Sequence, residues 1–546
     1  MMAMWAMLAI GQVPPDAGRI LRETPPQPER VPAATLPPML APAPPHKAQP
    51  VAGGDARVQV TRFDFTGNSA LSSETLRQAI APWAGRSLNF GELMEAVEAV
   101  EARYKQAGYF LAQGYLPPQK IRDGAIEIVI SEGRLGEIRL EGESRVSPDV
   151  LYAYLDRLPR NEALVLPTLE RQVLLINDLA GVHASLDLQA GDKPGITDVV
   201  LIQQAEELFT GRLDADNYGL PSTGVKRLSV TLNANSALHL GERVSFNLLT
   251  SENLRVTSYQ LRGDLPVGGD GWRLVASASR AQYSLGGAFS SLQASGTAES
   301  LRVGASYPLI RSRGANVTAH VEADRSWLVD KYGAIDTTLE KETRGLTASL
   351  SGEWLDELIG GGATRLDLAW RTGRFDPGPA ASVLDAPPFG PAAAGRFSKA
   401  TLAVQRQQTI TRDLSLQVQL SGQQAGKNLD SSEKFMLGGP ATLPGYAADE
   451  AIGDSGVHAR LGLRWQAMPE LALTAFADEA RLRLAHDPLP TATTNRQRLA
   501  DTGIRADWMF GKNFSANAIL AWARKEASSP AANDKARLWF TLSYAW

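Results

Sequence analysis

From Phe209 onward the chain alternates apolar and polar positions in segments of about ten residues, separated by clusters of Gly, Asp, Asn and Pro. Ser, Asn, Thr, Arg or Asp occupy much of the opposite face. The apolar positions of three such segments are Val230 and Leu232; Val244, Phe246 and Leu248; Leu366, Leu368 and Trp370. A period of two predicts strands with one apolar face. This pattern fits equally a membrane barrel with its apolar side outward and a soluble two-sheet sandwich.

The last strand favours the barrel. Leu538, Phe540, Leu542, Tyr544 and Trp546 share one face. A soluble edge strand exposing five such side chains would invite aggregation, whereas lipid accommodates them. The 339 residues from position 208 to the end give roughly 21 per strand and connection if the barrel has sixteen strands. Fourteen or eighteen strands fit the same length.

The region before the barrel has three parts. Residues 1–23 begin with an apolar run and end in an expected short helix from Pro14, but no Lys or Arg precedes Arg19, so a secretory signal is expected to be truncated there. Residues 24–56 are rich in proline, which predicts an extended linker. Residues 57–132 and 133–206 each carry the order strand, helix, helix, strand, strand, and we expect two small α+β domains.

A long loop at about 430–457 interrupts the strand pattern. Its glycines Gly438, Gly439 and Gly445, together with Phe435 and Tyr446, predict a tightly folded tip. Loops of this length inside compact domains are usually functional or disordered. This loop is too apolar for a solvated linker, and we interpret it as a plug or lid.

Composition excludes several functions. The 55 basic and 59 acidic residues leave no electrostatic footprint for nucleic acid. The sequence holds no cysteine and no histidine pair with metal-ligand spacing, so we expect neither a cofactor nor a metal. Gly453-Asp-Ser-Gly456 lacks the His and Asp context of a protease triad, and we expect no enzyme. Arg365 and Arg371, expected in the lumen, are interpreted as hydrating the pore, with guidance of a client as the alternative.

In this order the motifs resemble the outer-membrane transporters of two-partner secretion, the TpsB type of the haemolysin and filamentous haemagglutinin secretion/activation family. The first module carries the POTRA motif residues Phe65, Gly67, Asn68, Gly108, Tyr109, Gln119 and Gly124. The first barrel strand matches at Asp216, Asn217 and Gly219, and the C-terminal strand signal falls on Phe540, Tyr544 and Trp546.

The resemblance implies a transmembrane β-barrel of sixteen antiparallel strands, preceded by two periplasmic α+β POTRA domains and an N-terminal plug helix. It also implies a Gram-negative outer-membrane location and export of an unfolded TpsA-type exoprotein without nucleotide hydrolysis. Further partners expected are outer-membrane lipid, periplasmic chaperones and the barrel assembly machinery. A barrel-assembly factor of the same superfamily and a plugged diffusion porin are the alternatives.

The loop tip departs from the family pattern. Family members usually carry Val-Arg-Gly-Tyr there, and the arginine pairs with a lumen aspartate. Here the tip reads Leu443-Pro444-Gly445-Tyr446, while the matching strand keeps Phe476 and Asp478. A carboxylate without a cation in a narrow lumen would have its charged form disfavoured. We therefore expect Arg460 or Arg464, on the preceding strand, to pair with Asp478.

Overall fold

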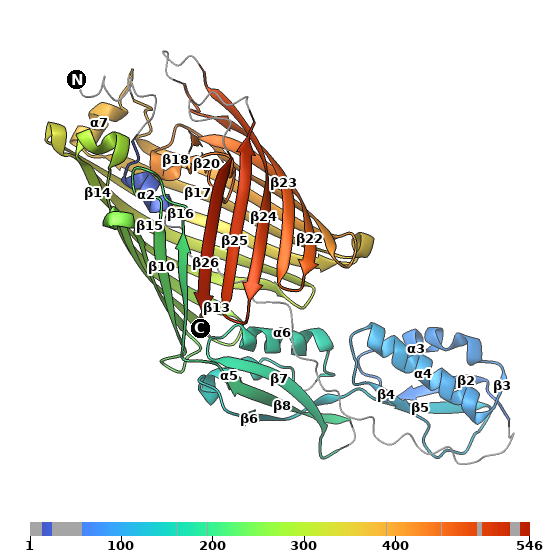
Figure 1. The fold of residues 1–546 in the computed structure, drawn as a ribbon. Coiled ribbons are helices and arrows are strands. Elements are labelled where there is room, and N and C mark those ends of the chain that lie inside the picture. Colours follow the sequence, from blue (N-terminus) through green and yellow to red (C-terminus); the bar gives the residue numbers. More distant parts are fainter. Residues whose placement is uncertain are drawn as a thin grey trace.

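The structure is a computed structural model that describes residues 14–23, 57–160, 162–193, 195–388, 390–448, 450–488, 494–524 and 536–546. A β-barrel stands at one end and two small α+β modules lie at the other, below the barrel end that holds the C-terminus (Figure 1). The predicted signal region up to residue 13 and the predicted linker at 24–56 lie outside the described residues.

Sixteen antiparallel strands form the barrel, which closes because β26 pairs with β9. The strands are β9 Phe209–Asp216, β10 Arg227–Asn235, β11 Arg243–Ser251, β12 Val256–Val267, β13 Trp272–Ser284, β14 Ala294–Arg311, β15 Ala315–Tyr332, β16 Thr337–Asp356, β17 Gly362–Pro377, β18 Gly395–Thr409, β19 Leu414–Ala425, β22 Ser455–Met468, β23 Leu471–Arg483, β24 Arg496–Phe510, β25 Phe514–Ala523 and β26 Arg537–Ala545. The sixteen-strand barrel is confirmed, and the sandwich and the other strand numbers are excluded.

The alternation along β22 and β26 decides which face meets lipid. Leu461 and Trp465 are 55% and 52% exposed on β22, and Leu538 is 59% exposed on β26. Their neighbour Trp539 is only 6% exposed because it points into the filled interior. Apolar side chains facing outward and polar ones facing inward are the arrangement of a membrane barrel. Among the described residues, no helix has the length and apolar character needed to cross a membrane.

The first module packs two helices on a small mixed sheet. Its elements are β1 Val58–Gln59, β2 Arg62–Thr66, α3 Ser73–Ala79, η1 Ala81–Trp83, β3 Ser87–Leu88, α4 Phe90–Gln106, β4 Gln113–Tyr115 and β5 Ala125–Ser131. Asn89 and Glu92 start α4 with a capping box. Val97, Val100 and Tyr104 form the buried face of α4 at the helical spacing. The strand order is β2-β5-β4.

The second module repeats this plan with longer strands. Its elements are β6 Arg134–Gly142, α5 Pro148–Leu155, α6 Leu166–Asn177, β7 Val182–Ala190 and β8 Ile196–Ala205, and the strand order is β6-β8-β7. Its core is fully buried and almost wholly aliphatic. In each module the edge strands have one sheet neighbour within the described residues. The outer side of β6 is bridged by Ala163 at Arg134, and the rest of that strand has no further strand beside it in the described part of the chain.

The remaining elements connect strands or lie inside the barrel. They are α2 Ala17–Glu23, η2 Glu252–Leu254, η3 Gly287–Leu292, η4 Gly333–Ile335, η5 Leu358–Gly360, α7 Pro379–Asp385, η6 Ser431–Glu433, β20 Phe435–Leu437 and β21 Ala451–Gly453. We call residues 426–454, between β19 and β22, the inward-folded loop. It ends three residues earlier than the sequence suggested, because Ser455 and Gly456 already pair with β23.

Candidate functional site

The short helix α2 lies inside the barrel against its inner wall (Figure 1). Ala17 and Ile20 are fully buried among wall residues that include Tyr283 and Leu328. On another side Gly18 touches the inward-folded loop so closely that an added Cβ would stand 2.5 Å from Ser431 Oγ. The helix is therefore held between wall and loop, in the plug position that the resemblance implied.

Polar side chains from helix, wall and loop meet in what we call the plug contact cluster: Asp16, Asp330, Lys341, Asp430 and Ser431. Lys341 Nζ lies 2.8 Å from Asp16 Oδ2, 3.3 Å from Asp330 Oδ2 and 3.8 Å from Asp430 Oδ2. Ser431 Oγ donates to Asp16 Oδ2 at 2.7 Å. One lysine of the wall thus binds the plug helix and the inward-folded loop at the same time.

The charge of Asp16 depends on this lysine. Burial acts to raise the pKa of Asp16, but the charge of Lys341 and hydrogen bonds from Lys341 and Ser431 outweigh burial and lower the pKa to about 2. The first helical N–H, that of Ala17, donates to Asp330 Oδ1 at 2.7 Å. Asp16 is therefore ionised at neutral pH, and the docked helix is fixed by charge as well as by packing.

Glu433 anchors the first half of the inward-folded loop. Its carboxylate lies 3.0 Å from Arg371 Nη2 and 2.8 Å from Lys399 Nζ, and Arg371 also pairs with Asp324. Burial acts to raise the pKa of Glu433, but the two cations lower it to about 2. Arg371 was expected to hydrate the pore or guide a client. It instead fixes the loop to the wall, because its guanidinium is buried between two carboxylates.

The second half of the loop is anchored by the segment that resembled a protease motif. Asp454 is fully buried and accepts from Lys434 Nζ at 2.7 Å, from the N–H of Leu429 at 3.2 Å and from the N–H of His486 at 2.8 Å. Ser455 Oγ accepts the N–H of Ala425 at 3.0 Å. These contacts close the base of the loop. Asp454 and Ser455 therefore have a structural role, in which they bind backbone N–H groups.

The loop reverses and docks on the wall as the glycine pattern suggested. Gly438 and Gly439 have φ of +116° and +76°, which only glycine adopts without strain. Leu443 and Tyr446 are buried against β23 and β24, while Phe435 is partly buried at the loop base beside them. The tip therefore lies in the interior as a packed apolar knob.

Pro444 and Gly445 occupy the most confined part of the tip. Trp539 Nε1 donates to the carbonyl of Pro444 at 2.7 Å, and the N–H of Gly445 donates to Asp501 Oδ2 at 2.6 Å. A Cβ on Gly445 would stand 2.7 Å from the backbone nitrogen of Ala523. Backbone groups thus make the polar contacts at the position where the family pattern has an arginine side chain.

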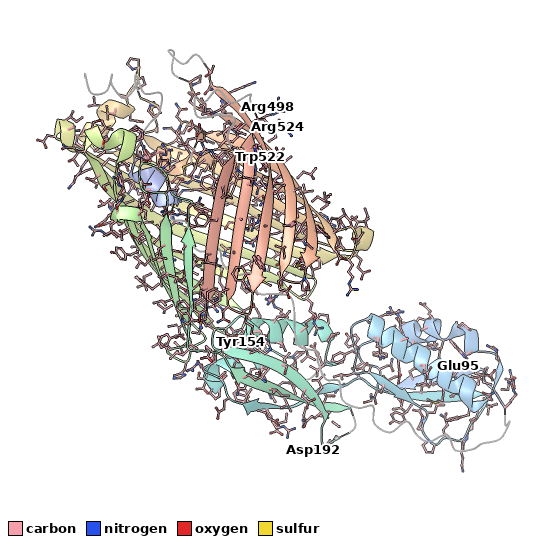
Figure 2. All side chains as sticks on the ribbon, in the orientation of Figure 1. Glu95, Tyr154, Asp192, Arg498, Trp522 and Arg524 are labelled. Atoms are coloured by element: carbon pink, nitrogen blue, oxygen red, sulfur yellow. The ribbon has the colours of Figure 1, made fainter. Side chains whose placement is uncertain are left out.

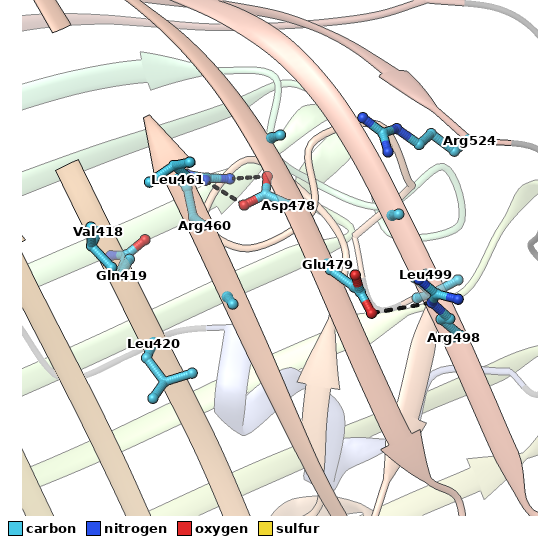
Figure 3. A pocket seen from close by; sticks show the side chains of 13 residues that line it. Val418, Gln419, Leu420, Arg460, Leu461, Asp478, Glu479, Arg498, Leu499 and Arg524 are labelled. Carbon is cyan, nitrogen blue, oxygen red and sulfur yellow. Dashed lines mark hydrogen bonds and ion pairs between the residues drawn. The ribbon is translucent and has the colours of Figure 1, made fainter. Parts of the chain in front are cut away.

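Asp478 has a cation after all, and it is Arg460. The guanidinium binds the carboxylate with both ends, Nε at 2.7 Å and Nη2 at 2.8 Å (Figure 3). Arg460 Nη2 also donates to the carbonyl of Thr442 at 2.7 Å, and its guanidinium lies 4.6 Å from the ring centre of Phe476. His458 Nε2 lies 3.1 Å from Asp478. Arg460 therefore links the lumen aspartate to the loop in place of the missing tip arginine.

Arg464 does not belong to this charge site. It pairs with Asp507 at 3.0 Å. The strand register explains the difference: Arg460 lies directly opposite Asp478, whereas Arg464 lies opposite Thr474. The expectation that either arginine would serve is corrected to Arg460 alone.

The predicted POTRA motif residues shape the first module. Gly67 and Gly124 have φ of +81° and +68°, and a Cβ at Gly67 would stand 2.2 Å from the carbonyl of Ile130. Asn68 donates to the carbonyl of Leu71 at 2.9 Å, and Gln119 exchanges two hydrogen bonds with the backbone of Glu127. Gly108, with φ of +90°, ends α4, while Phe65 and Tyr109 pack on the core. These residues therefore stabilise the turns and the core of the first module.

The residues predicted at the first and last strands lie together where the barrel closes. Asn217 continues the β9–β26 pairing with its side chain, accepting the N–H of Phe540 at 2.8 Å. Asp216 binds Arg227, and a Cβ on Gly219 would collide with the carbonyl of Gly224. Tyr544 stacks on Trp546, whose indole covers Gly211. Both sets of residues therefore stabilise closure.

Sequence reasoning missed the contacts that fix the second module to the barrel rim. Arg311 binds Asp178 at 2.8 Å, Arg313 binds Glu170 at 2.6 Å, and Arg171 donates to a barrel carbonyl at 2.9 Å. It also missed Lys341 as the centre of the plug contact cluster. The sequence pattern could have indicated this cluster, because Lys341 and Asp330 both fall at inward positions of neighbouring strands.

A closed barrel with a lipid-facing apolar wall, a lumen filled by its own N-terminal helix, and two modules at one rim define an outer-membrane transporter with periplasmic domains. Residues 195–487 match the haemolysin secretion/activation protein ShlB/FhaC/HecB family, and residues 58–133 match the ShlB-type POTRA domain. The first match spans more than half of the chain, so this chain belongs to the ShlB/FhaC/HecB family of TpsB-type transporters.

Relatives and solved structures agree. The chain is 27% identical over 467 residues to the heme/hemopexin transporter protein HuxB of Haemophilus influenzae (strain 86-028NP), covering 83% of this chain and 80% of that protein. It is 24% identical over 423 residues to the outer membrane transporter CdiB of Escherichia coli, covering 74% and 68%. The structure of CdiB from Escherichia coli matches with a TM-score of 0.71 at 20% identity, over 93% of this chain and 94% of that one, which shows a shared fold.

Proposed function

We propose that this transporter exports a secreted protein partner through its barrel, after the POTRA domains have bound that partner in extended form. The observation that carries the proposal is the plug helix. It is bound in the lumen by an ion-pair cluster and a small apolar face, and the chain continues from it to the domains at the periplasmic rim. Non-covalent contacts of this kind are reversible, so the lumen is a path that can open.

The POTRA sheets support capture of an extended segment. Edge strands β6 and β7 each have one hydrogen-bonded neighbour among the described residues, and so do β2 and β4. An added strand gains main-chain hydrogen bonds on such an edge. The second module is held at the rim by Arg311 and Arg313, so a segment bound there lies at the barrel entrance.

The proposal includes no catalysis and no nucleotide. The plug helix and the inward-folded loop are held by clusters of charged side chains. A passing polar chain can replace these contacts one by one, and folding of the partner outside the cell gives export its direction. Relatives are named for heme/hemopexin and hemolysin transport, which supports a secreted protein as the partner class here. Periplasmic chaperones and the barrel assembly machinery are proposed as further partners.

The test compares the secreted proteome and the outer-membrane proteome of the host with and without this gene. We expect one large secreted protein to disappear from the medium and to return on complementation, with unchanged levels of other barrel proteins. A general fall in barrel proteins would instead identify an assembly factor. Unchanged secretion together with loss of small-solute uptake would identify a porin.

A further inference from the structure

A cluster of arginines lies on the outside of the barrel, at the end away from the POTRA domains. Arg498 and Arg524 stand near this rim, with Trp522 below them (Figure 2). Strand parity places Arg481, Arg483 and Arg496 on the same outward face, and all five arginines are exposed. In an outer-membrane protein with periplasmic POTRA domains, this rim faces the outer leaflet and the cell exterior.

The strand register sets these arginines against one another. Arg481 lies directly opposite Arg498, and Arg483 lies directly opposite Arg496. Like charges directly opposite each other on a sheet are destabilising. Glu479 lies 2.9 Å from Arg481 and 3.2 Å from Arg498, so both arginines share this carboxylate. An anion placed between the arginines would relieve the repulsion.

The outer face of β15 to β17 has more carboxylates for each arginine. On β15 to β17 the outward arginines Arg325, Arg344 and Arg374 also lie directly opposite one another, but two carboxylates lie among these three arginines. Glu342 is 2.8 Å from Arg325, and Asp376 is 2.6 Å from Arg374 and 3.9 Å from Arg344. Charge on β15 to β17 is therefore largely neutralised by the chain itself. Among the residues that the structure describes, the outward faces at this end of β23, β24 and β25 carry five arginines and Glu479, a net positive patch.

A hollow in the outer wall adjoins this patch. It has a volume of about 740 Å³ and is floored by small outward residues, Ala459, Ala477 and Ala500. Val418 and Leu420 lie on one side of it, and Glu479 and Arg498 lie on the other (Figure 3). An apolar groove bordered by guanidinium groups suits a ligand with an acyl chain and an anionic head.

The depth of the arginine cluster in the membrane agrees with a lipid ligand. Tryptophan side chains prefer the level of the lipid headgroups, and Trp522 is 40% exposed on the outer face. Arg524 lies two residues beyond Trp522 along the same strand direction, about 7 Å further out. Arginine binds phosphate with two parallel hydrogen bonds. The guanidinium groups therefore lie where the phosphates of an outer-leaflet lipid lie.

We infer that Arg481, Arg498, Arg524 and the adjoining hollow form a binding site for a phosphorylated, multiply acylated lipid of the outer leaflet, the chemistry of lipid A. The phosphates bridge the opposed arginines, and one acyl chain lies in the alanine-floored hollow. The site fixes the rim of β23 to β25, the wall against which the tip of the inward-folded loop docks. This inference rests on the outer-membrane location and is independent of the exported partner.

The experiment measures binding of fluorescent lipid A to the purified full chain in detergent micelles. The variant R498Q/R524Q removes two guanidiniums, and R325Q/R374Q is the matched control on β15 and β17. We expect the first variant to bind lipid A about 10- to 30-fold more weakly, because each surface arginine contributes roughly a factor of five to lipid affinity. The control is expected to stay within about twofold of the unaltered chain.

Two further arms separate headgroup from acyl recognition. Ala477→Phe fills the hollow without touching an arginine and is expected to weaken lipid A binding, and phosphatidylcholine is expected to compete poorly. Each variant is first shown to be a folded barrel by its heat-dependent shift on a gel. Equal binding by R498Q/R524Q and the control, equal competition by phosphatidylcholine, or displacement of lipid A by excess inorganic phosphate would each overturn the inference.

Discussion

Replacing Lys341 by methionine removes the centre of the plug contact cluster while nearly preserving side-chain volume. Asp16, Asp330 and Asp430 then face one another without the ammonium group that lies within 4 Å of all three. Breaking a buried ion pair by removing one partner is strongly destabilising, because a buried charge is left unpaired. The loss acts on docking of α2, since the barrel itself stays closed through its strand pairing.

The size of the effect follows from Asp16. The docked state lowers its pKa from 3.8 to about 2, which corresponds to roughly 2–3 kcal/mol. A loss of about 2–3 kcal/mol makes docking of α2 roughly 30- to 150-fold weaker. In planar bilayers we expect Lys341→Met to spend a much larger fraction of time in the open, high-conductance state.

The pH dependence should also change sign. In the unaltered chain the lowered pKa of Asp16 favours docking fully above about pH 4, and this contribution is lost only toward pH 2, so the Asp16–Lys341 pair adds no pH dependence to the conductance between pH 5 and 8. Without Lys341, burial raises the pKa of Asp16, the docked state takes up a proton, and conductance should fall as the pH drops from 7.

Two control variants test whether the conductance measures undocking of α2. Lys331→Met, on an exposed outward position of the same wall, should behave as the unaltered chain, and deletion of residues 14–23 should give the open limit. If the deletion opens the pore but Lys341→Met conducts like Lys331→Met, the electrostatic account of docking is refuted.

Three further predictions concern the loop and the first module. Arg460→Gln should lower the thermal unfolding temperature of the barrel by several degrees, whereas Arg464→Gln, which does not touch the loop, should change it little; equal effects would contradict the register argument. Glu433→Gln should raise the current noise at pH 7, because the loop loses its ion pairs with the wall. The unaltered chain should show the same noise only well below about pH 4, since the lowered pKa of Glu433 keeps its carboxylate ionised above that pH. Gly67→Ala should destabilise the isolated first module by about 1–3 kcal/mol more than Gly85→Ala, because both have positive φ but only the former meets a carbonyl; equal denaturant midpoints would count against this.

The alternation of apolar and polar positions predicted strands with one apolar face, because lipid on one side and a polar lumen on the other impose a strict period of two, but the choice of a barrel over a sandwich came from the exposed apolar face of the last strand. The order of Leu538, Phe540 and Leu542 before the terminal Trp546 showed which face is outward. The same parity correctly put Arg460 and Arg464 in the lumen. It did not choose between them, since register depends on how two strands align and a shift of two residues leaves the faces unchanged.

The plug contact cluster was beyond sequence reasoning for a similar reason. Asp16 and Lys341 are 325 residues apart, and nothing local indicates that a helix at one end of the chain meets the first part of β16. Arg371 was interpreted as a hydrated lumen residue because the strand alternation showed only that its side chain points into the lumen, not which residue it contacts. Its partner Glu433 comes from a loop whose path inside the barrel is set by tertiary packing.

The most direct test of the central claim, that the lumen closed by α2 is the export path, is a reversible cross-link. The sequence has no cysteine, so Gly18→Cys and Ser432→Cys introduce a unique pair, and a Cβ at Gly18 lies 3.1 Å from Ser432 Cβ, close to the roughly 3.5–4.5 Å that a disulfide spans. The measurement is the amount of secreted partner in the medium before and after reduction. We predict that export stops when the disulfide forms and resumes when it is reduced. Each single-cysteine variant continues to export, and Gly18→Cys exports at least as much as the unaltered chain because its Cβ displaces the helix from Ser431. Undiminished export with the cross-link intact would show that the partner takes another route.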